Sequence, residues 1–169
     1  MKMRGRSVAK LFAVAIAVFA ALAHCRLSEA EEFSGQVIGV TDGDTITVLH
    51  AGYPERIRLA GIDCPEKRQA FGYRAKQLTS YLAFGKEVLV QAQGRDKYGR
   101  TIGEIVLPDG KSLNRELVRT GLAWWYRKYS NDQDLARLEY EARSAHAGLW
   151  AEPDAIPPWV FRHVSRGLR

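Results

Sequence analysis

Alternation of apolar and polar residues predicts that the first part of the folded chain is a set of short β-strands. In one of them Ile46 and Val48 face one side while Thr45 and Thr47 face the other, which is the two-residue period of a strand. Asp-Gly and Ala-Gly-Tyr-Pro sequences between the apolar runs are typical of turns. The expected strands are Val37–Val40, Thr45–Leu49 and Ile57–Ile62.

The rest of the chain combines one more pair of strands with helical periodicity. Glu87–Gln93 and Thr101–Leu107 alternate again and enclose a charged loop. Apolar residues at three- and four-residue intervals predict three helices. These are expected over Arg68–Phe84, over Leu113–Thr120, and from the capping sequence at Ser130–Gln133 to Gly148. Beyond them, prolines are expected to prevent regular helix and to leave a frayed basic tail (Pro153, Pro157, Pro158; Arg162, His163, Arg166, Arg169).

The N-terminal segment has the composition of a secretory signal peptide. A basic stretch precedes an apolar run from Leu11 to Ala23, which is short for a membrane span of about 20 residues. Small residues offer cleavage near Ala30 or, earlier, near Ala23. We therefore expect residues 1–30 to be removed and the protein to be exported to the periplasm or the extracellular space, without a stable membrane span. A lipid or signal anchor is the alternative. The remainder divides into one domain, 31–165, and a basic tail, 166–169.

Removal of that segment changes the charge of the protein. The whole chain carries 25 basic and 19 acidic residues, a net charge of +6. Five of the basic residues and one acidic residue lie in residues 1–30, which leaves 20 against 18, a net charge of +2. Nucleic-acid contacts must then come from local basic patches. Cys64 is the single cysteine left, so no internal disulfide is expected. The sequence holds neither a phosphate-binding P-loop nor Cys/His zinc spacing, which argues against nucleoside-triphosphate and zinc chemistry.

Acidic residues gather where the first strands end. Asp42 and Asp44 flank a glycine, and Asp63 and Glu66 surround a Cys-Pro pair. Taken alone, the D-G-D sequence is more often a plain hairpin turn. If the strands are neighbours, however, Asp44 and Asp63 meet at one end of the sheet, where like charges need a cation or bound protons. Carboxylate oxygens suit hard cations such as Ca²⁺, so the pattern favours a metal site.

Three motifs then follow one another in order: D-G-D-T at 42–45, R-L-x-x-I-D-x-P-E at 58–66 and D-K-Y-G-R at 96–100. In this order they resemble the staphylococcal nuclease (thermonuclease) family. N-R-E-L-V-R-T-G-L-A at 114–123 and P-P-W at 157–159 are similar to later landmarks of its bacterial members. The resemblance covers about residues 33–162. It implies an α+β fold that is mainly β, a five-stranded OB-fold barrel with three helices. Periodicity alone does not predict the closed barrel.

The resemblance also implies a site for one Ca²⁺ ion. Asp44 and Asp63 match the calcium-binding aspartates of the family. The backbone carbonyl of Cys64, which stands where the family usually has threonine, is expected to be a third ligand. A thiol at this position also raises the possibility of softer metals. Asp42 matches a neighbouring acid outside the direct set of ligands.

Catalytic roles follow from the same resemblance. Glu66 matches the residue that acts as the general base or orients the attacking water, and Arg58 and Arg100 match the two phosphate-binding arginines. Substrate contacts are expected from Lys97, Arg127 and Tyr129. The chain differs from the family pattern in two places, which concern substrate binding rather than the type of reaction. The loop after Glu66 is shorter than the lysine-rich loop of the staphylococcal enzyme, and Arg127 stands where a substrate-binding tyrosine is expected.

Together these features predict a secreted, monomeric, calcium-dependent phosphodiesterase. It would hydrolyse DNA and RNA with little sequence preference, as an endonuclease that leaves 3′-phosphates. One alternative is a non-catalytic nucleic-acid-binding module on the same fold. Another is an exported barrel that binds sugars or a protein partner and uses the acids only to hold a structural calcium. The presence of both Arg58 and Arg100 beside the acids disfavours these two alternatives.

Overall fold

The computed structural model describes residues 31–167. The expected signal segment, residues 1–30, lies outside the described residues, as do the last two residues of the expected basic tail. In the described part of the chain no helix combines the length and apolarity needed to cross a membrane.

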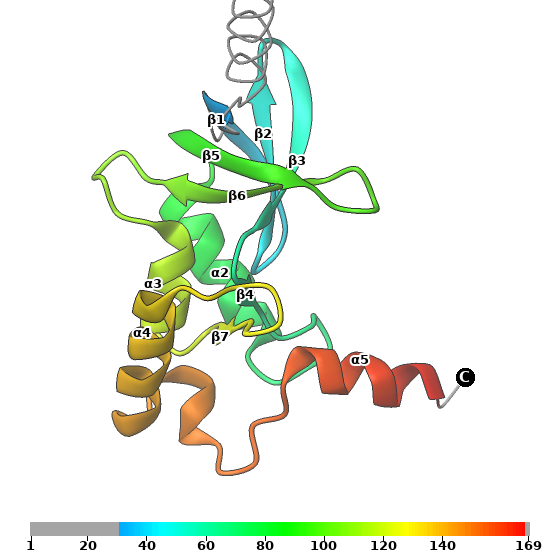
Figure 1. Cartoon of the computed structure of the whole chain (residues 1–169), viewed down its shortest axis with the longest axis vertical. Helices are drawn as coiled ribbons and strands as arrows, with labels where there is room; N and C mark the ends of the chain where they lie inside the picture. The colour runs from blue at the N-terminus through cyan, green and yellow to red at the C-terminus, as the bar shows by residue number, and fades with distance from the viewer. Residues whose placement is uncertain (1–30, 168–169) are drawn as a thin grey trace, which may run out of the picture.

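Seven strands and four α-helices with one 3₁₀-helix make up this part of the chain (Figure 1). The strands are β1 (Glu31–Asp42), β2 (Thr45–His50), β3 (Tyr53–Leu59), β4 (Ile62–Asp63), β5 (Glu87–Arg95), β6 (Thr101–Val106) and β7 (Trp124–Trp125). The helices are α2 (Gly72–Ala83), α3 (Leu113–Arg119), α4 (Gln133–Ser144), the 3₁₀-helix η1 (Gly148–Ala151) and α5 (Pro158–Gly167).

Five of the strands close into a barrel in the order β1-β2-β3-β6-β5, which confirms the predicted fold class. All neighbours are antiparallel except β3 and β6, whose parallel pairing sets Arg58 opposite Ile102. Strand β1 pairs with both β2 and β5, and register shifts between Val37 and Gly39 and between Val40 and Asp42 bend it between the two partners. The β2–β3 hairpin pairs Thr45 with Arg58, so the Asp42–Asp44 turn after β1 lies at the same end of the barrel as the end of β3.

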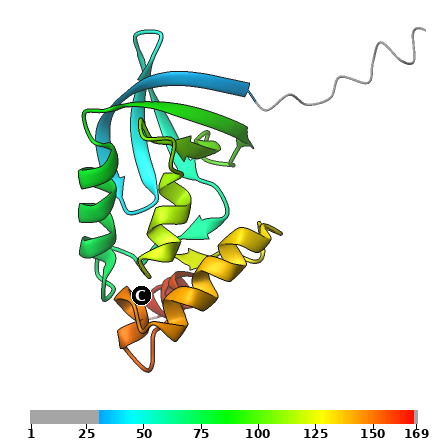
Figure 2. The same cartoon turned by 90° about the vertical axis from the view of Figure 1, so that its left-hand side faces the viewer.

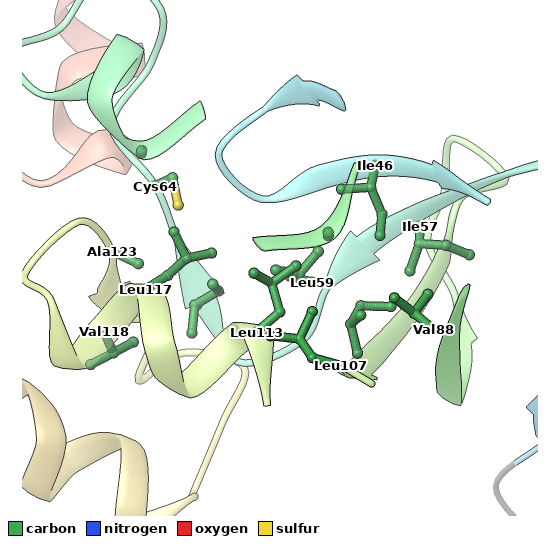
Figure 3. Packing of buried hydrophobic residues seen from close by; sticks show 14 of the residues in the cluster. Ile46, Ile57, Leu59, Cys64, Val88, Leu107, Leu113, Leu117, Val118 and Ala123 are labelled. Carbon is green, nitrogen blue, oxygen red and sulfur yellow. The ribbon is translucent and has the colours of Figure 1, made fainter. Parts of the chain in front are cut away.

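The barrel interior holds the core that alternation predicts. Ile46 and Val48 of β2, Ile57 of β3, and Val90 of β5 are fully buried. They belong to one cluster with Leu113 and Leu117 of α3. Figure 3 shows Leu59 and Leu107 next to Leu113 in this cluster. In Figure 2 helix α3 lies between the barrel and α4, so a single core connects the strands to the helical layer.

Helices α2, α3 and α4 confirm the three predicted helices. The spacing of Phe71, Ala75, Leu78 and Leu82 predicts that these residues form the buried face of the first one. The buried residues of α2 are instead Gly72, Ala75, Thr79 and Ala83. The helix turns this face inward because small side chains allow close contact with the barrel, while Leu78 and Leu82 pack at its margin.

The expectation that no helix follows Pro153 is wrong. Helix α5 begins at Pro158 and continues to Gly167, so Arg162 belongs to a helix and not to a frayed tail. Proline is tolerated in the first turn of a helix because the backbone N–H that it lacks has no partner there. Residues 31–167 therefore contain a fourth α-helix beyond the three that the resemblance implies.

Candidate active site

The Asp42–Asp44 turn lies in a narrow space between helix α2 and Cys64. A Cβ atom on Gly43 would be 2.7 Å from Ala75 Cβ and 2.8 Å from Cys64 Sγ, so glycine is required for close approach. The buried Thr79 donates a hydrogen bond of 2.6 Å to the Gly43 carbonyl. Helix α2 therefore fixes the turn that carries two of the candidate site acids.

Arg58 joins acids from two different strand ends. Its Nη2 lies 2.8 Å from Asp63 Oδ1 and 3.2 Å from Asp44 Oδ2, and its Nη1 donates to the Leu59 carbonyl at 2.9 Å. The backbone N–H of Cys64 donates to the same Asp44 Oδ2 at 2.7 Å. Asp44 and Asp63 thus meet at one end of the barrel, as the strand pattern predicts. The Arg58 side chain is only 15% exposed and is not a solvated strand residue.

Arg100 approaches the same cluster through Thr45. Its Nη1 is 3.4 Å from Thr45 Oγ1, and that hydroxyl donates to Asp44 Oδ1 at 3.2 Å. Asp96 holds Arg100 in place, because its Oδ2 accepts from the Arg100 Nε at 2.7 Å. Asp96 also accepts the backbone N–H groups of Tyr98 and Arg100, which folds the β5–β6 loop. The fold of this loop therefore places the Arg100 guanidinium beside the acid cluster.

A third arginine, which the sequence analysis did not place at the site, completes the cluster. Arg162 of α5 lies 2.7 Å from Asp63 Oδ2 through Nη2 and 2.8 Å from Glu66 Oε1 through Nη1. The prolines before it predict that helix structure ends, which places Arg162 in the tail. The signal that could have found it is Pro-Pro-Trp followed by Phe161 and Val164, since proline favours the first position of an amphipathic helix.

Burial and mutual repulsion shape the protonation of the acids. Burial, with the charge of Asp44 as the next cause, raises the pKa of Asp42 to about 6. Burial also raises the pKa of Asp63, although Arg162 and Arg58 oppose this shift. For Arg58, burial lowers the pKa, but the charges of Asp44 and Asp63 outweigh it and raise the pKa above the ordinary value. Arg58 therefore stays charged, and the acids around it carry more negative charge than the neighbouring arginines neutralise.

The charge balance and the donor atoms fit a divalent cation. Four carboxylates, those of Asp42, Asp44, Asp63 and Glu66, surround the guanidiniums of Arg58 and Arg162, a deficit of two positive charges. Asp42 Oδ1 is buried without a hydrogen-bond partner. Within residues 31–167 no three acid, His or Cys side chains form a ready-made metal cage, because the arginines occupy the space between the acids. Oxygen donors with excess negative charge are the ligands that Ca²⁺ prefers.

The raised pKa of Asp42 gives a testable pH dependence. In cation-free protein, Asp42 binds more protons when folded (pKa about 6) than when unfolded (3.8), so its contribution to stability falls as pH rises between these values. We expect Asp42→Asn to gain about 2–3 kcal/mol of unfolding free energy relative to wild type between pH 4 and pH 7. Urea unfolding with a chelator present measures this difference. The exposed Asp154→Asn is the control, and an Asp42→Asn difference that is the same at both pH values would contradict the assignment.

Cys64 faces the core rather than the acids. Its side chain is 4% exposed, and Figure 3 shows its sulfur near Leu117 and Ala123. Burial raises the pKa of the thiol well above its ordinary value, and the charge of Asp44 adds to the shift. The thiol is therefore neutral in the metal-free protein, and a preference for softer metals at this position stays a prediction. The role of the Cys64 carbonyl as a metal ligand stays a prediction.

The three residues expected to contact substrate do not join the acid cluster. Lys97 and Tyr129 are exposed, with the Lys97 ammonium near Tyr98 and the Tyr129 ring edge-on to Tyr126. Arg127 donates to Oε2 of Glu139 at 2.8 Å and lies over the Trp125 ring.

Arg127 instead lines a separate pocket. This pocket has a volume of about 380 Å³ and lies between β7 with the turn that follows it, α4 and α5. Glu139 of α4 is 2% exposed and also accepts the Trp125 backbone N–H at 3.2 Å, so it organises the wall that carries Arg127. No sequence pattern marks Glu139, because an acid next to the apolar residues of a helix resembles a solvated one.

Comparison with known proteins identifies the family to which this barrel and its acid–arginine cluster belong. Residues 56–152 match the family model described as staphylococcal nuclease homologue. A micrococcal nuclease of Shigella flexneri is 42% identical over 145 residues, which cover 80% of this chain and 83% of the relative. An uncharacterized endonuclease of Escherichia coli O157:H7 is 43% identical over 132 residues, 78% of this chain and 86% of the relative. A staphylococcal-like nuclease of Arabidopsis thaliana is 38% identical over 112 residues, 66% of this chain and 34% of the relative. The chain belongs to the staphylococcal nuclease family.

Family membership settles the class of activity. The protein is a nuclease, an enzyme that cleaves phosphodiester bonds in nucleic acids. The predictions of an enzyme of this class and of a nucleic-acid substrate are therefore confirmed at that level. The binding-module and sugar-binding alternatives are set aside as primary functions.

Proposed function

We propose that this nuclease is calcium-dependent and hydrolyses both DNA and RNA with little sequence preference, as an endonuclease that leaves 3′-phosphates. The observation that carries the proposal is the shared binding of Asp44 and Asp63 to the Arg58 guanidinium, with Glu66 linked to the same cluster through Arg162. This arrangement combines an excess of carboxylates with a planar phosphate-binding group at one end of the barrel.

The chain's own residues divide the work of hydrolysis. Arg58 and Arg100 offer planar, always charged donors that neutralise the phosphate and the charge that develops on it. Glu66, whose side chain is 40% exposed, accepts a proton from a water or aims that water at phosphorus. Asp44 and Asp63, with the Cys64 carbonyl, would hold the ion. When bound, Ca²⁺ supplies Lewis-acid polarisation of a phosphoryl oxygen.

Calcium dependence is tested with the purified protein and two DNA substrates. Circular single-stranded DNA distinguishes endonuclease from exonuclease action, because only an internal cut converts it to linear fragments. We expect cleavage with Ca²⁺, loss of cleavage with a chelator, and recovery when excess Ca²⁺ is added. Fragments of end-labelled DNA should shift in gel mobility after phosphatase treatment, as 3′-phosphates require. Cleavage that continues unchanged in chelator would refute the calcium requirement, and digestion of linear DNA alone would refute the endonuclease assignment.

We further propose that the protein acts after export, as a monomer. The basic stretch and apolar run of residues 1–30 support export, and a low net charge of the remaining chain is compatible with free diffusion outside the cell. Cell fractionation with N-terminal sequencing of the recovered protein identifies the compartment and the cleavage site. A full-length protein retained in the cytoplasm would refute export.

A further inference from the structure

Helix α5 is held firmly against the candidate active site by aromatic contacts. The ring of Trp159, near the start of α5, stacks on Tyr126 at a centroid distance of 5.1 Å and meets Trp124 edge-on at 5.7 Å. Just before the helix, the Ile156 carbonyl accepts a hydrogen bond from the side-chain amide of Gln69, in the loop that follows Glu66. Figure 1 shows α5 beside this loop. The helix is therefore a fixed part of the site wall.

Arg162 projects from this fixed helix onto two carboxylates at once. Its Nη2 donates to Asp63 Oδ2 at 2.7 Å, while Nη1 donates to Glu66 Oε1 at 2.8 Å and reaches Asp63 Oδ1 at 3.3 Å. The planar fork of a guanidinium suits such a bridge, and an ammonium cannot reproduce it. One side chain thus sets the separation between Asp63 and Glu66.

The two acids depend on Arg162 to different degrees. Asp63 is 1% exposed and has Arg58 as a second partner at 2.8 Å. Glu66 is 40% exposed and follows Pro65 in a loop. Among the described residues Arg162 is its only ion-pair partner. Without Arg162, the Glu66 carboxylate is free to rotate into solvent, whereas Asp63 stays in place.

We propose that Arg162 is a positioning residue that holds the Glu66 carboxylate beside Asp63, so that the C-terminal helix is part of the catalytic machinery. The proposal rests on the role given to Glu66 above. Arg162 acts through Glu66. Without Arg162 the site keeps its ion-binding acids and its phosphate-binding arginines, but the Glu66 carboxylate that orients the attacking water is no longer held in place. Misplacement of a catalytic group by about 1 Å is enough to cost about 100-fold in rate.

A double-mutant cycle tests this coupling with the complete protein. We expect Arg162→Ala to lower kcat for DNA cleavage by about 30- to 100-fold with KM changed less than about threefold. Arg162→Lys should recover part of the loss, because it keeps the charge and loses the bridge. In the Glu66→Gln background, Arg162→Ala should have almost no further effect on kcat, since the group it positions is already disabled. Arg137→Ala is the matched control, an arginine on α4 with two carboxylate partners, and should be silent.

A second readout needs no activity. In chelator, the Tm decreases caused by Arg162→Ala and by Glu66→Ala, each of which removes the contact, should be non-additive, as expected for residues in contact. Independent, additive effects of Arg162→Ala and Glu66→Gln on kcat would overturn the positioning role. Higher activity of Arg162→Ala at limiting Ca²⁺ would also overturn it, and would mean that Arg162 competes with the ion for the acids. A wild-type protein that fails to cleave would overturn the proposed function itself, and additive Tm changes would show that the contact is absent. The two failures are thus distinguishable.

Discussion

Replacement of Glu66 by glutamine is expected to lower kcat for DNA hydrolysis by at least about 100-fold while the protein stays folded. Glutamine keeps the size of the side chain and can still hydrogen-bond to Arg162, but its amide cannot accept a proton as a carboxylate does. Because Glu66 is 40% exposed and outside the core, the loss should fall on chemistry rather than on stability. Steady-state kinetics on single-stranded DNA at saturating Ca²⁺ measure it, and circular dichroism verifies the fold.

Glu141→Gln is a closely matched control for this experiment. Glu141 is an exposed glutamate whose arginine partner, Arg137 of α4, lies at the same distance of 2.8 Å. Loss of one such surface pair is worth at most about 1 kcal/mol and should leave kcat unchanged. If Glu66→Gln retained more than about a tenth of wild-type kcat, Glu66 would be neither a general base nor essential for orienting the attacking water. A hydroxide ion would then have to attack phosphorus without help from this residue.

The barrel strands were predictable because their signals are local. The period of two in residues such as Ile46 and Val48 fixes which face is buried, and both positions are fully buried in the structure. Short turns after Asp42 and Ala51 then make β1, β2 and β3 neighbours. Closure of the barrel depends on the parallel pairing of β3 with β6, whose partners Arg58 and Ile102 are far apart in sequence. No local pattern encodes that pair, so the family resemblance supplied it.

The same distinction explains which site residues were found. Asp44 and Arg58 lie within two successive hairpins, and Asp63 follows β3 after a short turn, so local strand pairing and chain continuity bring the three to one end of the barrel. Arg162 is 96 residues from Glu66, and its position depends on how α5 docks through Trp159. Periodicity shows that a helix has an apolar face and not which surface that face will meet. Tertiary contacts of this kind require the structure.

Arg58→Met is expected to destabilise the cation-free protein by about 3–5 kcal/mol, because it leaves Asp44 and Asp63 buried without their shared partner. It should also lower kcat/KM by about 100- to 1000-fold, since one preorganised phosphate-binding group is lost. Urea unfolding in chelator measures the first effect and DNA cleavage the second. Arg56→Met is the control, because Arg56 lies two residues earlier on the same face of β3 and is exposed.

Calcium should separate these two losses in Arg58→Met. With the guanidinium gone, the acid cluster carries one more uncompensated negative charge, so the variant should gain more unfolding free energy from saturating Ca²⁺ than wild type does. The activity should not return with the stability, because the ion replaces the charge of Arg58 between the acids but not its planar donors toward phosphate. An Arg58→Met protein that is less than about 1 kcal/mol destabilised in chelator would mean that Arg58 serves the substrate alone. Full recovery of kcat/KM at high Ca²⁺ would mean that it serves the acids alone.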